Sequence, residues 1–159
     1  MKESKPFTHV DASGKLRMVD VSKKAPTRRT SHASCLIVTD VDLTGRTFEE
    51  LDPVHASRIA GILAAKQTAT LIPLCHPLNI SDVQVDVVPV TNGLEVQAKI
   101  VTVDQTGVEM EALVACAMTA LSIVSSLLSE DPSAHVEDLV LLKKSGGKSG
   151  DWGRLVKPT

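Results

Sequence analysis

Aromatic side chains are nearly absent from this sequence, which has two Phe, one Trp and no Tyr among 159 residues. Val, Leu, Ile and Ala must therefore fill the core, because hydrophobic residues still make up 43% of the chain. This composition disfavours nucleic-acid modules, which stack bases on aromatic side chains. A formal net charge of −2 gives no global positive field to hold a polyanion. We expect any anion to be bound locally.

Cysteines and long apolar runs are also scarce. Cys35, Cys75 and Cys116 are odd in number and form no CxxC pair, which disfavours a disulfide framework and a thiolate metal site. No stretch of eighteen apolar residues is free of charge, and residues 1–13 contain no apolar run typical of a signal peptide. We expect one cytoplasmic domain over residues 1–159, with reduced cysteines and no membrane or nucleic-acid partner.

Local patterns predict two helices. Asp52-Pro53 combines an N-cap residue with proline at the first helical position, and Ile59, Ile62, Leu63 and Lys66 then recur at helical spacing to give one apolar face. The second helix is predicted to begin at a capping box, Thr106-Gly107-Val108-Glu109, in which the Thr and Glu side chains satisfy free amides. We expect it to run to about residue 128.

Alternating polar and apolar residues predict strands at 82–87 and 94–100, joined as an antiparallel hairpin by the turn residues Thr91-Asn92-Gly93. Further strands are expected at 34–40 and 136–142, with a short extended piece at 15–20. The resulting order, β-α-β-β-α-β, predicts an α+β ferredoxin-like fold with the helices on one face of an antiparallel sheet.

The second predicted helix is apolar nearly all round, because its few polar residues do not form one charged face. Such a helix is usually buried on both sides. In a domain of this size the second side is expected to meet another subunit, so the pattern predicts an oligomer.

A lysine- and glycine-rich loop at 144–150 is the first candidate site, and it points to a phosphorylated small molecule as ligand. Gly146 and Gly147 allow backbone amides to approach an anion, while Lys144 and Lys148 supply positive charge. The loop is not a Walker A motif, because Leu142 occupies the position of the required first glycine. The alternative is a flexible, solvated tail.

The loop at 71–78 is the second candidate. Pro73 and Pro77 disfavour helix there, so we expect His76 to be held in an extended loop, where it can bind phosphate or transfer protons near neutral pH. Side chains of adjacent residues in an extended chain point in different directions, so Cys75 and His76 are not expected to share a metal. The alternative for His76 is an ordinary surface or core histidine.

Two carboxylates and a basic stretch complete the candidates. Glu109 and Glu111 are about 200° apart on a regular helix and cannot both face one site. Because Glu109 is assigned to the capping box, Glu111 is the functional candidate, as a general base or as a partner for a guanidine-like ring edge. The basic stretch at 23–29 is either a solvated segment or a contact for a triphosphate across a subunit boundary.

Taken together, the motifs resemble one family, the cyclic pyranopterin monophosphate synthases of molybdenum-cofactor biosynthesis, called MoaC. The matching segments occur in family order and span nearly the whole chain. They are His9-Val10-Asp11 with Met18-Val19-Asp20-Val21-Ser22, Arg58-Ile59-Ala60-Gly61-Ile62 with Ala64-Ala65-Lys66, and residues 71–78, 106–113 and 144–151.

The resemblance implies a ferredoxin-like subunit in a homohexamer, a trimer of dimers with the pocket at the dimer interface. It implies a cyclised dihydroguanosine triphosphate as substrate, which is rearranged to cyclic pyranopterin monophosphate with loss of pyrophosphate. It implies no resident cofactor and leaves open a divalent ion on the triphosphate. The implied substrate contacts are Leu74, Cys75, His76, Met110 and Glu111, with Arg29, Lys144 and Lys148 on the phosphate side, and the implied catalytic residues are Glu111, His76 and Lys144.

The sequence departs from the family at three charged positions. Ser125 stands where the family has a catalytic aspartate, and Leu128 stands where it has a lysine three residues later. Before the first core helix, Glu50 replaces the lysine of a Lys-Gly-Asp motif, of which only Asp52 is kept. Loss of one general acid or base typically lowers a rate by about 10² to 10⁴.

Three hypotheses follow from the retained and the missing residues. The first is a synthase in which neighbouring groups such as Glu50 or Asp131 compensate. The second is a catalytically impaired paralogue that keeps the nucleotide pocket, or that pairs with an active subunit. The third is an enzyme acting on a different cyclised purine nucleotide.

Overall fold

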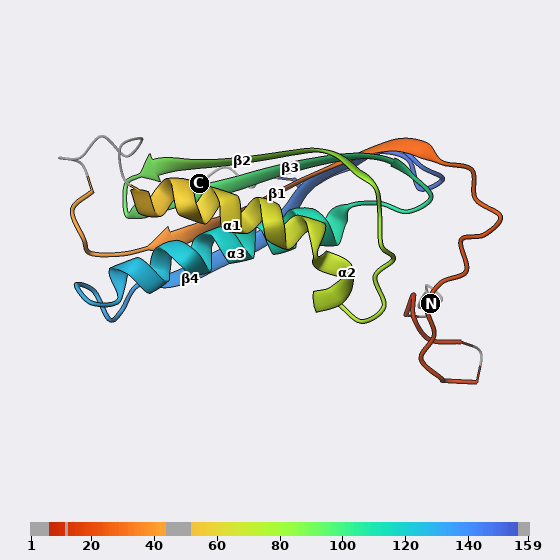
Figure 1. Cartoon of the computed structure of the whole chain (residues 1–159), viewed down its shortest axis with the longest axis horizontal. Helices are drawn as coiled ribbons and strands as arrows, with labels where there is room; N and C mark the ends of the chain where they lie inside the picture. The colour runs from red at the N-terminus through yellow and green to blue at the C-terminus, as the bar shows by residue number, and fades with distance from the viewer. Residues whose placement is uncertain (1–6, 12, 44–51, 156–159) are drawn as a thin grey trace.

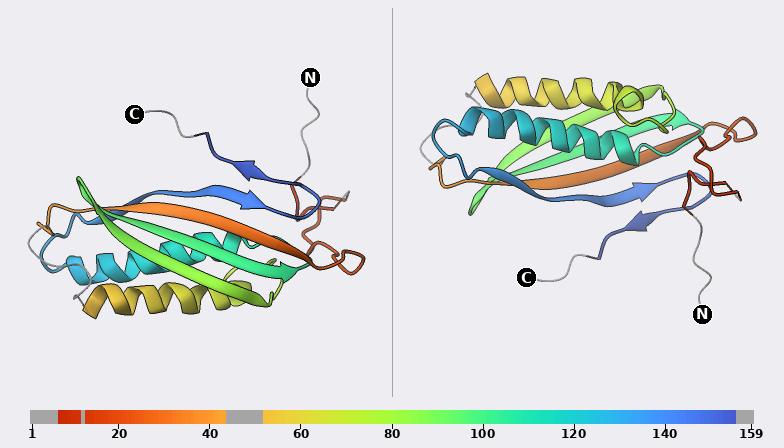
Figure 2. Two further views of the ribbon diagram at one scale, coloured as in Figure 1. Left: turned by 90° about the horizontal axis from the view of Figure 1, so that it is seen from above. Right: turned by 90° about the horizontal axis from the view of Figure 1, so that it is seen from below.

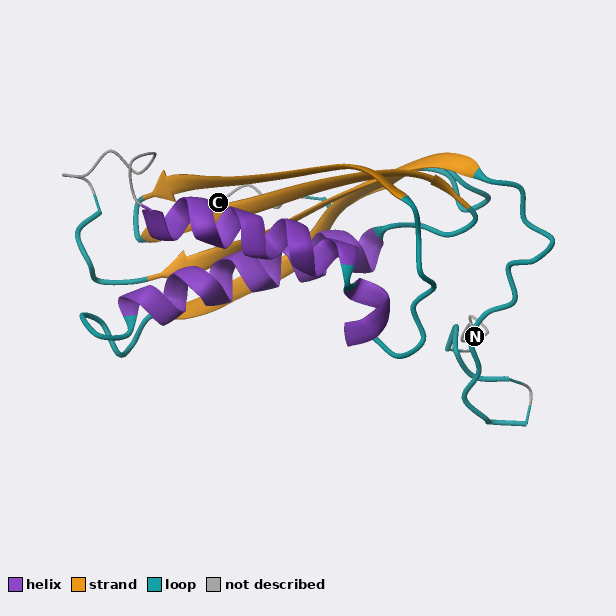
Figure 3. Cartoon of the chain, viewed as in Figure 1, coloured by secondary structure: helices purple, strands orange, loops and turns teal. Residues whose placement is uncertain are grey.

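The computed structural model describes residues 7–11, 13–43 and 52–155 and shows an antiparallel sheet with its helices on one face (Figures 1 and 3). The strand order is β2-β3-β1-β4-β5, and β1, β3, β2 and β4 carry the predicted β-α-β-β-α-β connectivity. The α+β ferredoxin-like prediction is therefore confirmed. The elements are β1 (Thr27–Val38), α1 (Asp52–Lys66), α2 (Thr68–Leu71), β2 (Ile80–Val90), β3 (Gly93–Asp104), α3 (Glu109–Leu127), β4 (His135–Ser145) and β5 (Trp152–Gly153).

The predicted hairpin is also confirmed. Val90 of β2 pairs with Gly93 of β3, so only Thr91 and Asn92 lie in the turn. Gly93 has a φ of 140°, and a Cβ there would collide with the carbonyl oxygen of Ile37 on β1. The tight turn and the close neighbouring strand therefore both require glycine at this position.

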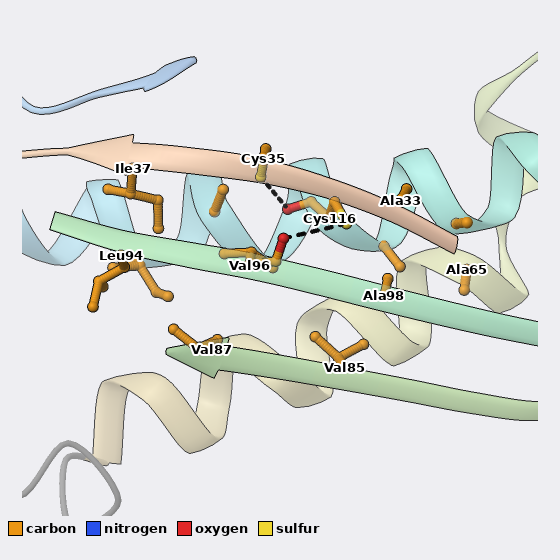
Figure 4. Close-up of a cluster of buried hydrophobic side chains, with 14 of the residues drawn as sticks. Ala33, Cys35, Ile37, Ala65, Val85, Val87, Leu94, Val96, Ala98 and Cys116 are labelled. Atoms are coloured by element: carbon orange, nitrogen blue, oxygen red, sulfur yellow. Dashed lines mark hydrogen bonds between the residues drawn. The ribbon is translucent and has the colours of Figure 1, made fainter. Parts of the chain in front are cut away.

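The core lies between the sheet and the two long helices and contains no aromatic side chain among its buried residues (Figure 4). Cys35 of β1 and Val96 of β3 lie beside Cys116 of α3, and Ile37 lies further along β1, where it pairs with Leu94 of β3. The Cys35 thiol donates to the carbonyl of Cys116 over 3.7 Å. Small aliphatic and thiol side chains thus fill the core, as the composition predicts.

The apolar face predicted for α1 is only partly buried. Ile59 and Leu63 are 59% and 51% exposed, and the face that α1 buries carries small residues, with Gly61 at its centre. A Cβ on Gly61 would collide with the hydroxyl of Thr119 on α3 and lie 2.9 Å from the carbonyl of Ala115. The two helices approach so closely that only small side chains fit between them, and this turns the larger apolar residues outward.

The start of α3 also differs from its prediction. Its N-cap residue is Val108, whose side chain makes no capping hydrogen bond, so the predicted capping box does not form. By length and composition α3 is apolar enough to cross a membrane, but it packs beside α1 against β1, β3 and β4 and is a core helix. Met118 and Leu121 on its outer side remain exposed, so the described chain covers only one side of the helix.

Candidate functional site

A cavity of about 280 Å³ lies where the start of α3, the 72–78 loop and the segment before β1 meet. Its volume is just below the usual range of about 300 to 1,000 Å³ for small-molecule sites. Six of the eight residues implied as substrate contacts line it, namely Arg29, Leu74, Cys75, His76, Met110 and Glu111. Lys144 and Lys148 do not line it.

The 72–78 loop contributes its side chains through a turn. The amide of Cys75 donates to the carbonyl of Ile72 over 3.0 Å, directly after α2 ends at Leu71. Residues 75–79, which follow this turn, form no helix or strand, and Cys75 and His76 both line the cavity. Burial, and then the nearby carboxyl of Glu111, raises the pKa of the Cys75 thiol, which favours its protonated form.

Glu111 is the most perturbed acid of the cavity. It is only 4% exposed, and burial, with a smaller contribution from the charge of Glu109, raises its pKa from 4.5 to about 7. A carboxyl with this pKa is present in both protonation states near neutral pH, so it can give or take a proton during a reaction. This is the behaviour expected of a general acid or base.

Glu109 also lines the cavity, although it was predicted to be occupied in a capping box. Its Oε1 accepts a hydrogen bond from Nζ of Lys144 over 3.0 Å instead. Glu109 and Glu111 thus both line the cavity, although residues two apart on a regular helix were not expected to face one site. Lys144 therefore contacts the site through this ion pair rather than by lining the cavity.

The lysine- and glycine-rich loop is ordered by its own contacts. Gly146 and Gly147 have φ values of 87° and 74°, and a Cβ on Gly147 would collide with the guanidinium of Arg29. The backbone amide of Gly146 donates to Oδ1 of Asp151 over 3.2 Å, so a carboxylate of the protein itself occupies this amide. Ser149 is the residue of this loop that lines the cavity, and Lys148 is exposed beside it.

Arg29 on β1 presents a positive charge to the cavity. Its Nε donates to the carbonyl of Asp104 over 3.0 Å and its Nη2 to the carbonyl of Gln105 over 2.9 Å. Since carbonyls carry no net charge, these bonds orient the guanidinium without neutralising it. Lys24 lines the cavity as well, and its own carbonyl accepts from the side chain of Gln105 over 3.0 Å.

One wall of the cavity comes from the segment before β1, of which the sequence singled out only the basic stretch at 23–29 as a possible phosphate contact. Thr8, His9, Val19 and Lys24 all line it. The His9-Val10-Asp11 motif was visible in the sequence, but nothing local indicated that this segment folds back onto the start of α3. Its position depends on contacts with residues about 80 positions later, such as Gln105.

The structure does not bring Ser125 and Leu128 to this cavity. Ser125 lies fourteen residues beyond Glu111 on α3, about 21 Å away along a regular helix, and both residues are exposed. Glu50 lies outside the described residues. In the described part of the chain, no three His, Cys, Asp or Glu side chains come together in a group that could hold a metal ion.

Asp131, one of the two groups suggested to compensate, has a structural role in the described chain. Its carboxylate accepts from the hydroxyl of Thr39 over 2.7 Å, the amide of Asp40 over 2.9 Å and the hydroxyl of Ser133 over 2.6 Å. These bonds, that of Ser133 first, hold its pKa well below the ordinary value. A carboxylate so stabilised is a weak base.

Comparison with known proteins gives a consistent assignment. Residues 18–147 match the MoaC family. A cyclic pyranopterin monophosphate synthase of Nocardioides sp. is 48% identical over 156 residues, covering 93% of this chain and 95% of that protein. The proteins of that name from Streptomyces avermitilis and Desulforapulum autotrophicum are 43% and 44% identical, covering 93% and 92% of this chain and 89% and 93% of their own lengths. The chain belongs to the MoaC family.

Proposed function

We propose that this protein is a cyclic pyranopterin monophosphate synthase of molybdenum-cofactor biosynthesis. It would convert the cyclised dihydroguanosine triphosphate into cyclic pyranopterin monophosphate and pyrophosphate. The observation that carries the proposal is the placement of Glu111, with a pKa of about 7, in one cavity with His76 and the cation Arg29. Its relatives bearing that name support the same reaction.

The roles that we propose follow from charge and position. Glu111 is the general acid or base and His76 a second group that transfers protons, since both line the cavity. Lys144 is the third catalytic candidate and acts through its ion pair with Glu109. Arg29 and Lys148 contact the phosphates, while Leu74, Cys75 and Met110 shape the wall around the purine-derived ring.

We also propose that the complete site needs two subunits, within a homohexamer built as a trimer of dimers in the cytoplasm. The cavity is small, and the positions of Ser125 and Leu128 lie about 21 Å and about 25 Å from Glu111 along the axis of α3. Exposed apolar residues on the outer side of both helices give a second subunit a surface to cover. They are Ile59, Leu63, Met118, Leu121 and Leu128.

The residues at the C-terminal end of α3 support a second candidate function. Ser125 and Leu128 bring neither a carboxylate nor an ammonium to the interface where the family has both. A subunit of this kind would bind the nucleotide through its cavity and lack part of the proton-transfer machinery. It would then be a catalytically impaired paralogue, or the partner of an active subunit in a mixed oligomer.

The test is to incubate the purified protein with the cyclised dihydroguanosine triphosphate and to follow pyrophosphate release and pterin formation. Stoichiometric formation of both products supports the synthase. Tight binding without either product would support the impaired paralogue. GTP serves as a control. It lacks the additional ring that joins ribose and base in the cyclised substrate, so it should yield neither product.

A further inference from the structure

The segment before β1 forms a wall of the cavity that the roles above do not use. Its described residues, 7–11 and 13–26, lie at the end of the sheet where β4 ends (Figure 2). Thr8, His9, Val19 and Lys24 face the cavity from this segment. Two of the four carry nitrogen donors suited to an anion.

Backbone and side-chain hydrogen bonds fix this wall. The amide of Arg17 donates to the carbonyl of His9 over 3.0 Å, beside an antiparallel bridge between Val10 and Leu16. The carboxylate of Asp11 accepts from the amides of Ser13 and Lys15 and closes the turn between them. Lys24 is fixed separately, through the bond from Gln105 to its carbonyl. The backbone of both donors is thus held in place.

His9 has an unused polar atom in this wall. Its Nδ1 is buried and has no hydrogen-bond partner in the described part of the chain. A buried polar atom without a partner costs free energy that a bound ligand can recover. An imidazole N–H at this position is a suitable donor to an oxygen of the ligand.

The charges around the cavity favour an anionic oxygen. Lys24 and Arg29 line it, and neither makes an ion pair with a carboxylate in the described chain. The charge of Glu109 is balanced by Lys144, which stands outside the lining. The cavity is therefore locally cationic in a protein whose formal net charge is −2. Oxyanions are the ligands that such a set of donors attracts.

We propose that His9 and Lys24 form, together with Arg29, a clasp for the polyphosphate of the ligand, on the wall supplied by the N-terminal segment. The nucleotide as ligand rests on the proposed function. The clasp itself requires only a polyphosphate chain, so the two proposals can fail separately.

Binding of inorganic triphosphate, measured by calorimetry at low salt, tests the clasp. We expect His9→Ala and Lys24→Ala each to weaken binding about tenfold, the effect of losing one hydrogen bond to a charged group. Lys23→Ala is the matched control, because it removes the same charge from the neighbouring residue, which does not line the cavity. It should stay within about twofold of the unsubstituted protein, since the Lys23 side chain does not line the cavity and makes no direct contact with the ligand.

Two further measurements separate a ligand contact from a structural effect. His9→Asn, whose amide can offer a donor near the position of Nδ1, should recover part of the lost affinity. Lys24→Ala should bind with a weaker dependence on salt than Lys23→Ala. Unchanged melting temperatures would show that the variants are folded, as expected for a segment outside the core.

The possible results of these measurements separate the clasp from the proposed function. Equal effects of Lys23→Ala and Lys24→Ala, unaltered binding by His9→Ala, or failure of the unsubstituted protein to bind triphosphate would overturn the clasp. Triphosphate binding that depends on His9 and Lys24, without any synthase turnover, would support the clasp and contradict the proposed function. Turnover with an unchanged KM in both variants would support the function and overturn the clasp.

Discussion

The two ends of α3 differ in their chemistry although one helix connects them. At the N-terminal end, Glu109 and Glu111 line a cavity, and burial shifts the pKa of Glu111 to about 7. At the C-terminal end, Ser125 and Leu128 are exposed and uncharged. One helix can thus present a buried carboxyl able to transfer protons at one end and an exposed, uncharged surface at the other. We propose that a second subunit brings the two kinds of end together.

Removing the carboxyl of Glu111 at the N-terminal end of α3 should change the catalytic rate more than any other substitution proposed below. We expect Glu111→Gln to lower kcat by about 10² to 10⁴, because the amide cannot transfer a proton. Glu137→Gln, on the exposed part of β4, is the control and should leave kcat unchanged. An equal kcat in Glu111→Gln and the unsubstituted protein would remove Glu111 from the chemistry.

The close contact between α1 and α3 at Gly61 should show the next largest effect, a loss of stability when the contact is disturbed. Gly61→Ala places a Cβ against the hydroxyl of Thr119, and we expect a loss of about 3 kcal/mol of unfolding free energy in urea titrations. Adding Thr119→Ala removes the colliding hydroxyl and should restore part of the loss. If the double variant were no more stable than Gly61→Ala, the backbone contact with Ala115 would dominate.

Charged residues introduced at the C-terminal end of α3 test whether this end takes part in catalysis. Ser125→Asp combined with Leu128→Lys should raise the single-turnover rate about 10²-fold, the lower range for one general acid or base. Ser129→Asp with Glu130→Lys introduces the same residue types at exposed positions nearby and should have no such effect. An unchanged rate in the first double variant would show that this end does not face the site.

The smallest expected effect is a change of the unfolding free energy with pH, caused by the raised pKa of Glu111. The unfolded chain ionises this carboxyl near pH 4.5, whereas the folded protein resists ionisation up to about pH 7. Its contribution to stability is therefore complete below pH 4.5 and is lost as the pH rises through 7. Between pH 5 and 8 we expect a loss of about 2 kcal/mol that Glu111→Gln lacks. Parallel pH profiles of the unfolding free energy in both proteins would contradict the shift.

Local patterns predicted the fold well because they describe local physics. Alternation located β2 and β3, the residues Thr91-Asn92-Gly93 predicted their turn, and α3 ends at Leu127, one residue before the predicted end. Which face of α1 is buried could not be predicted, because it depends on the contact between Gly61 and Thr119, which are distant in sequence.

The site was predicted in part for the same reason. The loop with Cys75 and His76 and the start of α3 are short motifs that carry their own chemistry. The ion pair of Glu109 with Lys144, 35 residues away, displaced the expected capping box. The wall with His9 and Lys24 also depends on tertiary contacts. Lys24 belongs to the basic stretch at 23–29 that the sequence indicated as a possible triphosphate contact, whereas the place of His9 in the cavity was found only in the folded chain.

The most direct test of the account is the release of pyrophosphate from the cyclised dihydroguanosine triphosphate in a single turnover, with the unsubstituted protein in excess. We expect one equivalent of pyrophosphate together with cyclic pyranopterin monophosphate, and almost none from Glu111→Gln on the same timescale. Bound substrate that remains intact in the unsubstituted protein would contradict the assignment as a synthase.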